Sequence, residues 1–173
     1  MHKQKNLNSL KINTPFGQIL AISDEKGLYL LQFVEDKGLK SKIKKLCTTT
    51  QSDIISDSSE PLLSISEELI EYFDGSLNQF KTPFHLLGTD FQKLCWMELT
   101  KIPFGQTISY QQQATNINKP QTYRAVANAN GANPLAIIVP CHRIIRNNGH
   151  LGGYAGGVHI KQHLLHLESK NST

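Results

Sequence analysis

Residues 136–143 read Ala-Ile-Ile-Val-Pro-Cys-His-Arg, and this stretch organises the second half of the chain. The four apolar residues predict a short buried strand that ends at Pro140. Cys141 follows directly, so its thiol would stand at the end of a rigid element with His142 and Arg143 beside it. Cationic and proton-accepting neighbours favour the thiolate, which is the nucleophilic form of cysteine. The stretch therefore predicts a reactive cysteine.

The other two cysteines lack such neighbours. Cys47 and Cys95 are expected to be ordinary structural thiols, and three scattered cysteines in 173 residues do not indicate a disulfide framework. The 39% hydrophobic and 18% charged content excludes a largely disordered chain. No apolar run approaches the ~18 residues of a membrane span, and no apolar segment follows the basic N-terminus. A reduced, cytoplasmic protein without membrane contact is expected.

Two short helices are predicted upstream of the Cys141 stretch. Ser109 can cap a helix over 110–115, and residues 121–130 form a second helix that carries Arg124. This pair has the outline of a helix-turn-helix. A further helix, capped by Asp90, is predicted to run to Leu99, and the last helix is predicted over 159–167, after a glycine-rich loop.

The first half of the chain indicates a small sheet with helices. Short apolar runs at 10–12, 19–22 and 28–33 are separated by turn sequences, which is typical of an antiparallel meander. Residues 40–59 are expected to form a short helix and then a mobile loop. A helix capped by Ser59 follows and closes at Gly75, with an apolar stripe made by Leu62, Ile65, Leu69, Ile70 and Phe73.

These elements predict an α+β protein with two domains. Residues 1–85 would form a small α/β domain, and residues 86–173 a mainly α-helical domain with a winged-helix or helix-turn-helix motif. The segment 78–88 would link them.

Charge is distributed unevenly between the two halves. Residues 1–87 have ten lysines and eleven acids, a net charge of −1, whereas residues 88–173 have five lysines, three arginines and three acids, a net charge of +5. The arginines Arg124, Arg143 and Arg146 lie within 23 residues of one another. A basic half of this kind is typical of a polyanion-binding surface, and a merely solvated basic face is the alternative.

The second half resembles the O6-alkylguanine-DNA alkyltransferases over roughly residues 90–168. The Pro-Cys-His-Arg core within its apolar strand is a specific signature of that family, and the first 85 residues match in general layout, a sheet and helix domain resembling ribonuclease H. The matching motifs are Asn133-Pro134, Ile137–Ile145, Gly152–Gly157, Lys161–Glu168, Gly105–Tyr110 and Arg124–Val126.

The resemblance implies direct, irreversible transfer of an alkyl group from O6 of guanine in DNA, and from O4-alkylthymine, to Cys141. A soft thiolate suits displacement at an alkyl carbon. His142 would accept the thiol proton through a bridging water, and Glu168 would orient the imidazole. Asn133 would hold the turn before the active site, and Tyr110 would donate a proton to the departing guanine. Methylated Cys141 is a thioether, so the protein would act once.

The resemblance also implies base extrusion from double-stranded DNA. Arg124 would fill the space that the extruded nucleotide leaves. The glycine-rich loop would let backbone groups approach the base closely. The expected substrate- and DNA-binding residues are Tyr110, Gln111, Thr122, Tyr123, Arg124, Ala125, Ala127, Ile144, Tyr154, Ala155, Gly156 and Gly157. The protein is expected to act as a monomer.

The sequence departs from the family pattern in two places. Ala155 stands where some members have serine, so only its backbone N–H would be available. Some members bind zinc in the N-terminal domain, but His2, Cys47 and His85 are too few for a four-ligand site. The histidines 159, 163 and 166 share one helix face and are expected to be exposed residues, not ligands. Neither a metal nor a cofactor is expected.

Two other classes of function remain open at the level of sequence. A thiol hydrolase using Cys141, His142 and Glu168 would turn over many times on a small ester or amide. A non-catalytic DNA-binding relative would recognise lesions without transfer, but such a protein should lack the acceptor thiol. Incubation with DNA that contains labelled O6-methylguanine separates the three functions. An alkyltransferase takes up label stoichiometrically, a hydrolase shows multiple turnover, and a non-catalytic relative binds without transfer.

Overall fold

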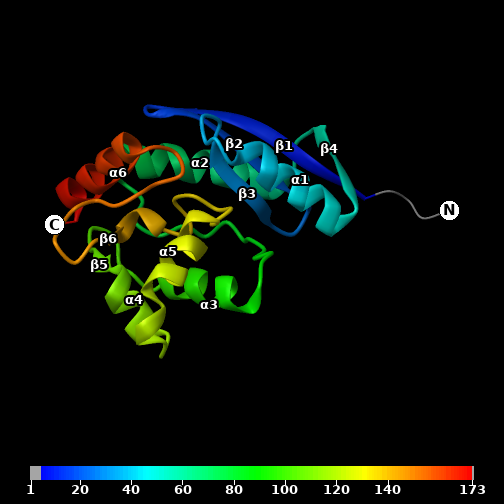
Figure 1. Cartoon of the computed structure of the whole chain (residues 1–173). Coiled ribbons are helices and arrows are strands. Elements are labelled where there is room, and N and C mark those ends of the chain that lie inside the picture. The colour runs from blue at the N-terminus through cyan, green and yellow to red at the C-terminus, as the bar shows by residue number, and fades with distance from the viewer. Residues whose placement is uncertain (1–4, 173) are drawn as a thin grey trace. The chain divides into compact units, whose positions relative to one another are not determined.

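The computed structural model describes residues 5–172, which divide into two compact units between Leu87 and Gly88 (Figure 1). The first unit contains a sheet and two helices, and the second is mainly helical. The predicted α+β class is therefore confirmed. The predicted domain boundary, between residues 85 and 86, lies two residues before the observed division.

The first unit is built on a four-stranded sheet with the order β3-β2-β1-β4. Its strands are β1 (Lys5–Thr14), β2 (Gly17–Ser23), β3 (Leu28–Phe33) and β4 (Ser52–Ser56). The predicted meander is confirmed, since β1, β2 and β3 pair antiparallel. The loop predicted after the short helix within residues 40–59 is wrong in part, because β4 lies in that segment and pairs parallel with β1. This edge strand is mostly exposed, and its polar composition hid it from an apolar pattern.

Two helices complete the first unit, α1 (Leu39–Thr50) and α2 (Glu60–Asp74). Ser59 caps α2 as predicted, and Gly75 ends it in the left-handed conformation with φ 89°. The buried face of α2 contains Pro61, Leu62, Ile65, Leu69 and Tyr72. The predicted place of Ile70 in this face is wrong, since 66% of it is exposed. It follows Leu69 by one residue and is therefore rotated about 100° around the helix.

The segment predicted as a linker belongs to the first unit up to Leu87, and only Gly88 falls in the second. Leu28 N–H donates to Pro83 O (2.9 Å), and His85 N–H donates to Leu28 O (2.7 Å). The His85 ring also hydrogen bonds to Asp24 across 3.0 Å. A Cβ at Gly27 would lie 2.9 Å from Pro83 O, so this close approach requires glycine.

The second unit contains α3 (Asp90–Leu99), α4 (Tyr110–Asn116), α5 (Tyr123–Gly131) and α6 (Val158–Asn171). Thr89, not Asp90 as predicted, caps α3, because Thr89 and Gln92 exchange hydrogen bonds in a capping box. Ser109 caps α4 as predicted. A short 3₁₀ turn over Pro120–Thr122 precedes α5, so the second helix of the pair begins two residues later than predicted.

Packing of α3 against α4 and α5 fixes the helix-turn-helix. The Trp96 indole donates to Ala129 O (2.8 Å). The buried amides of Gln113 and Asn130 exchange two hydrogen bonds, of 3.1 and 2.7 Å, and Gln113 also donates to Cys95 O. Because all of these donors and acceptors are buried and paired, the relative position of the three helices is tightly specified.

The predicted strand over residues 136–139 is wrong. These residues form a turn in which Val139 N–H donates to Leu135 O (3.0 Å), and Ile137 adopts φ 71°. A short apolar run predicts burial but not backbone conformation, and no neighbouring strand pairs with it in the part of the chain that the structure describes. The turn leads into a 3₁₀ helix, Cys141–Arg143, and then into β6 (Ile144–Ile145), which pairs parallel with β5 (Ile108–Ser109).

Replacing Gln113 with leucine is expected to destabilise the second unit by about 1–3 kcal/mol, because Asn130 and Cys95 O lose buried partners. Urea unfolding followed by fluorescence of Trp96, the chain's single tryptophan, measures this unit. Gln112→Ala, at an exposed position on the same helix, is the control and should cost less than about 0.5 kcal/mol. Equal losses in both variants would contradict a special role for the buried pair.

Candidate active site

The carboxylate of Glu168 is the centre of a buried polar cluster in the second unit. Glu168 and His142 both have 0% exposure, and the His142 Nε2 atom lies 2.7 Å from Glu168 Oε1. Arg143 donates to both carboxylate oxygens, at 2.9 and 3.0 Å, and its remaining terminal nitrogen donates to Ile102 O. The backbone N–H of Gly105 also donates to Glu168 (3.2 Å). One side chain thus connects α6, the 3₁₀ helix and the loop after α3.

The environment sets the protonation states of this cluster. Burial alone would raise the pKa of Glu168, but hydrogen bonds and charge from His142 and Arg143 hold the pKa below its ordinary value. Burial lowers the pKa of His142, although its bond to Glu168 opposes that shift. His142 is therefore neutral at pH 7. A carboxylate only accepts, so Nε2 of His142 has the proton and Nδ1 is the basic nitrogen.

Asn133 determines the path of the chain into the cysteine. Its amide nitrogen donates to Val139 O (2.8 Å) and to the Cys141 sulfur (3.3 Å), and its oxygen accepts from Leu135 N–H (2.9 Å). One buried amide thus holds both ends of the turn and contacts the sulfur. Cys141 is half-buried and therefore accessible, whereas Cys95 is buried and burial raises its thiol pKa to about 11.

The Cys141 side chain lines an inner cavity of about 300 Å³. Volumes of this size are typical of small-molecule sites. The wall comes from α4, α5 and the glycine-rich loop, and its residues are Tyr110, Ala127, Asn128, Asn130, Gly131, Cys141, Gly153, Tyr154 and Ala155.

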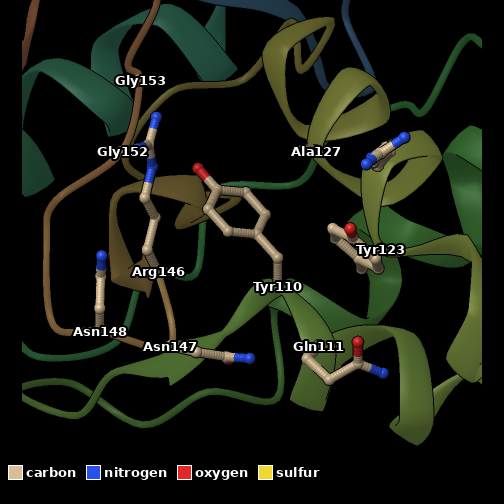
Figure 2. A pocket seen from close by; sticks show the side chains of 10 residues that line it. Tyr110, Gln111, Tyr123, Ala127, Arg146, Asn147, Asn148, Gly152 and Gly153 are labelled. Atoms are coloured by element: carbon tan, nitrogen blue, oxygen red, sulfur yellow. The ribbon is translucent and has the colours of Figure 1, made fainter.

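An outer cavity of about 650 Å³ adjoins the inner one, and Tyr110, Ala127 and Gly153 line both. The other residues of its wall are Gln111, Tyr123, Arg124, Arg146, Asn147, Asn148 and Gly152. Figure 2 shows Tyr110 projecting into the middle of this space, with the Arg146 side chain alongside it.

Tyr110 is held between the two cavities by the glycine-rich loop. A Cβ at Gly152 would lie 2.9 Å from the Tyr110 hydroxyl, and Gly152 has φ 73°, so glycine is required there. Burial raises the pKa of Tyr110, as does the charge of Cys141, while Arg146 lowers it. The phenol is therefore protonated at neutral pH and available as a donor.

Comparison with known proteins identifies this arrangement. The family model for the 6-O-methylguanine DNA methyltransferase DNA-binding domain matches residues 90–170, and that for its ribonuclease-like domain matches residues 10–86. The chain belongs to the 6-O-methylguanine DNA methyltransferase family. The resemblance that the sequence motifs indicated is thereby confirmed, as is the ribonuclease-like layout of the first half.

Individual members of the family align over nearly the whole chain. The methylated-DNA–protein-cysteine methyltransferase of Methanosarcina barkeri is 43% identical over 160 residues, which are 92% of this chain and 96% of the relative. The crystal structure of Mycobacterium tuberculosis O6-methylguanine methyltransferase superposes with a TM-score of 0.82 at 35% identity, covering 96% of this chain and 95% of that one. A structure of the same bacterium's OGT in complex with DNA superposes with a TM-score of 0.80 at 34% identity, covering 96% and 94%.

As a member of this methyltransferase family, the protein repairs DNA by transferring an alkyl group to a cysteine of its own chain. DNA is its partner. Among the described residues, no helix is long and apolar enough to cross a membrane.

The structure brings most of the predicted site residues together. Tyr110, Gln111, Tyr123, Arg124, Ala127, Cys141, Tyr154 and Ala155 line one or both cavities. Thr122, Ala125, Gly156 and Gly157 do not line either cavity, although Thr122 and Ala125 lie at the start of α5 near Arg124. Ile144 is a correction: it has 0% exposure in β6, so its side chain cannot contact DNA, and its carbonyl accepts a hydrogen bond from Lys161.

The sequence did not show what Arg143 and Lys161 do. Arg143 is buried against Glu168, so it does not belong to the basic surface on which its charge was counted. Lys161 has 0% exposure and donates to the carbonyls of Ile144, Leu151 and Gly153, which holds the glycine-rich loop beside Cys141. Burial lowers its pKa to about 8, opposed by the charge of Cys141. The sequence offers no local signal for the burial of Lys161, because its acceptors are backbone carbonyls of other segments.

The sequence predicts no metal site in either half of the chain. Within residues 5–172, no group of three His, Cys, Asp or Glu side chains is arranged to hold a metal ion. His159, His163 and His166 are all exposed on α6. His2, which entered the count of zinc ligands, lies outside the described residues.

Acid is expected to destabilise the second unit through this cluster. His142 has a folded-state pKa below its ordinary 6.5, and Glu168 below its ordinary 4.5, so the unfolded chain binds more protons as pH falls through these values. The contribution of His142 to the free energy of unfolding is complete above pH 6.5, and that of Glu168 is complete above pH 4.5. Each contribution is lost as the pH falls below these values. Urea unfolding by Trp96 fluorescence at pH 7, 5.5 and 4 measures the decline.

Two variants test the source of this pH dependence. Glu168→Gln should be less stable at pH 7, because Arg143 loses its carboxylate, and should lose less stability than the wild type between pH 5.5 and 4. Asp90→Asn, which removes an exposed carboxylate in α3, should leave the decline unchanged. A wild-type stability that stays constant from pH 7 to 4 would contradict the assignment.

Proposed function

We propose that the Cys141 sulfur receives the alkyl group, with O6-alkylguanine in double-stranded DNA as the substrate. The observation that supports this most directly is the position of Cys141: it is the cysteine that lines the inner cavity, beside the buried His142–Glu168 pair. The inner cavity has the size of a small-molecule site, and it adjoins a larger cavity lined by two arginines.

The thiol is activated by proton transfer to His142. Nδ1 of His142 is buried and makes no hydrogen bond within the described chain, so this basic nitrogen is available to accept a proton. A water molecule relays the proton from Cys141, since Cys141 lines the inner cavity whereas its neighbour His142 is fully buried and does not line it. The imidazolium that forms is stabilised by the Glu168 carboxylate. Glu168 stays ionised because it also accepts hydrogen bonds from Arg143.

The thiolate then displaces guanine from the alkyl carbon. A carbon–sulfur bond forms as the carbon–O6 bond breaks, and its electron pair passes into the guanine ring. Tyr110, protonated and facing the inner cavity, donates a proton to the departing base and regains one from solvent. The product is a thioether on Cys141 and unmodified guanine.

Base extrusion explains the use of a recessed cavity. A base stacked in duplex DNA cannot bring O6 to a sulfur inside the protein, so the nucleotide must leave the helix. Arg124 is exposed on α5 at the outer cavity and lies 5.7 Å from the ring of its neighbour Tyr123. This position suits a side chain that enters the base stack and replaces the extruded nucleotide.

Single use follows from the same arrangement. No second cysteine lines the inner cavity, and a thioether is a poor leaving group, so nothing among its lining residues regenerates the thiol.

The alternative function, a thiol hydrolase, would need an acyl intermediate open to water. Membership of the methyltransferase family does not support that function. All proposed site residues come from one unit of one chain, which supports action as a monomer. Cytoplasmic location stays a prediction.

Cys141→Ala is expected to abolish transfer of label from O6-methylguanine DNA while DNA binding is retained, because the acceptor atom is removed and the surface is unchanged. Incubation with labelled duplex, followed by counting of protein-bound label and by gel-shift titration, measures both. Cys47→Ala and Cys95→Ala are the matched controls and should keep one label per chain. Transfer by Cys141→Ala, or its loss in Cys47→Ala, would show that the acceptor is elsewhere.

Arg124→Ala is expected to slow repair of duplex DNA by at least about tenfold and to leave the reaction with free O6-benzylguanine nearly unchanged, because the free base pays no cost of unstacking. Second-order rate constants with the two substrates measure this. Glu168→Gln impairs the proton path and should slow both substrates alike. Equal slowing of both substrates by Arg124→Ala would instead assign Arg124 a role in folding.

A further inference from the structure

Arg146 is a charged residue at the outer cavity that the reaction described above does not use. It lines the same wall as Arg124 and, in Figure 2, its side chain extends past Tyr110 toward Gly152 and Gly153. Neither arginine is buried. Arg124 comes from α5 and Arg146 from the loop after β6, so two separate elements bring positive charge to one cavity.

The backbone around Arg146 is held by a tight turn. Arg146 N–H donates to His150 O (2.8 Å), and Gly149 N–H donates to Arg146 O (2.9 Å), with Gly149 at φ 82°. The Asn148 side chain accepts from His150 N–H (3.2 Å) within the same turn. Arg146 therefore projects from a fixed base, not from an open loop.

The charge of Arg146 is not neutralised by the protein. Among the described residues, its guanidinium makes no ion pair or hydrogen bond, whereas Arg143 donates to Glu168 and to Ile102 O. Residues 88–173 contain three acids. Glu168 is buried, Glu98 pairs with Lys101, and Asp90 is the first residue of α3, so none of them lines the outer cavity.

These observations point to an anionic ligand group. We infer that Arg146 binds a DNA phosphate adjacent to the extruded nucleotide and so positions that nucleotide for transfer to Cys141. The inference rests on the proposed function. Because Tyr110, Ala127 and Gly153 line both cavities, a base in the inner cavity leaves its sugar and phosphates in the outer one, where Arg146 stands. A guanidinium matches the geometry of a phosphate.

The role of Arg146 differs from that of Arg124. Arg124 replaces a base in the stack, so its effect requires a duplex. Arg146 contacts the backbone of the nucleotide that moves, so its effect persists on single-stranded DNA that contains O6-methylguanine. It acts through substrate position and not on the reacting atoms.

The test is a coupling experiment between Arg146→Gln and neutral phosphates. Duplexes containing O6-methylguanine are made with ordinary phosphates, or with one methylphosphonate placed immediately 5′ or immediately 3′ of the lesion. Second-order rates of methyl transfer are measured for the wild type, Arg146→Gln and Arg146→Lys. Lys170→Gln, at an exposed position on α6 that lines neither cavity, is the control for loss of one charge.

Arg146→Gln should react about tenfold more slowly than the wild type with ordinary duplex and with single strands. The slope of the logarithm of the DNA-binding constant against the logarithm of salt concentration should become shallower by about one. On one of the two methylphosphonate duplexes, Arg146→Gln and the wild type should react at the same, reduced rate. Arg146→Lys should recover part of the rate. Free O6-benzylguanine should react equally with all variants.

Three results would overturn the inference. An equal slowing by Arg146→Gln on every duplex, whichever phosphate is neutral, would show that it does not bind either phosphate. Slower reaction with free O6-benzylguanine would show that Arg146 acts on Tyr110 or on the inner cavity. An equal loss in Lys170→Gln would show a general effect of charge. Transfer by the wild type to Cys141 is measured in the same experiment, so failure of the proposed function is seen separately.

Discussion

The hydrogen bonds that the buried Glu168 carboxylate accepts are the interactions on which the candidate active site depends. It accepts hydrogen bonds from His142 and Arg143 in the 3₁₀ helix and from the backbone of Gly105 in the loop after α3, so it joins two separate segments of the second unit to α6. A buried charge is tolerated only when it is fully paired, so the segments must meet at this point. The same pairing keeps Glu168 ionised, fixes the His142 tautomer and leaves Nδ1 as the basic nitrogen. The contacts that join these segments are therefore the same contacts that set the protonation states of Glu168 and His142.

Around that cluster, polar side chains replace regular secondary structure as the means of holding the backbone. Asn133 holds the turn before Cys141, and Lys161 holds the glycine-rich loop through three carbonyls. Both are buried, so loss of either would leave backbone groups without partners. This explains how a cysteine outside any strand or long helix can have a definite position. Arg124 and Arg146 take no part in this support and are exposed at the outer cavity.

The three arginines lie close together in the sequence but in different environments: Arg124 and Arg146 are exposed and Arg143 is buried. Their proximity in the chain predicted a basic, polyanion-binding face, and the family and its DNA complex agree with that. Yet Arg143 is internal and Arg146 is not, although two residues separate them. Neighbours in sequence alternate between core and surface where a 3₁₀ turn passes into a short strand. Local pattern does not resolve such a change, because the partner of Arg143 lies 25 residues away.

The sequence by itself determined the family, the two-part α+β organisation, the candidate nucleophile and most helix positions, because motifs, caps and apolar periodicity are local properties. It missed β4 and wrongly predicted a strand over residues 136–139, since strand formation depends on a distant partner: β1 supplies one for β4, and no strand pairs with 136–139 in the described chain. Only the tertiary structure decided which polar groups are buried together. Burial and pairing set the charge of Glu168, the neutrality of His142 and the availability of Arg146, and these arise from contacts between segments far apart in the chain.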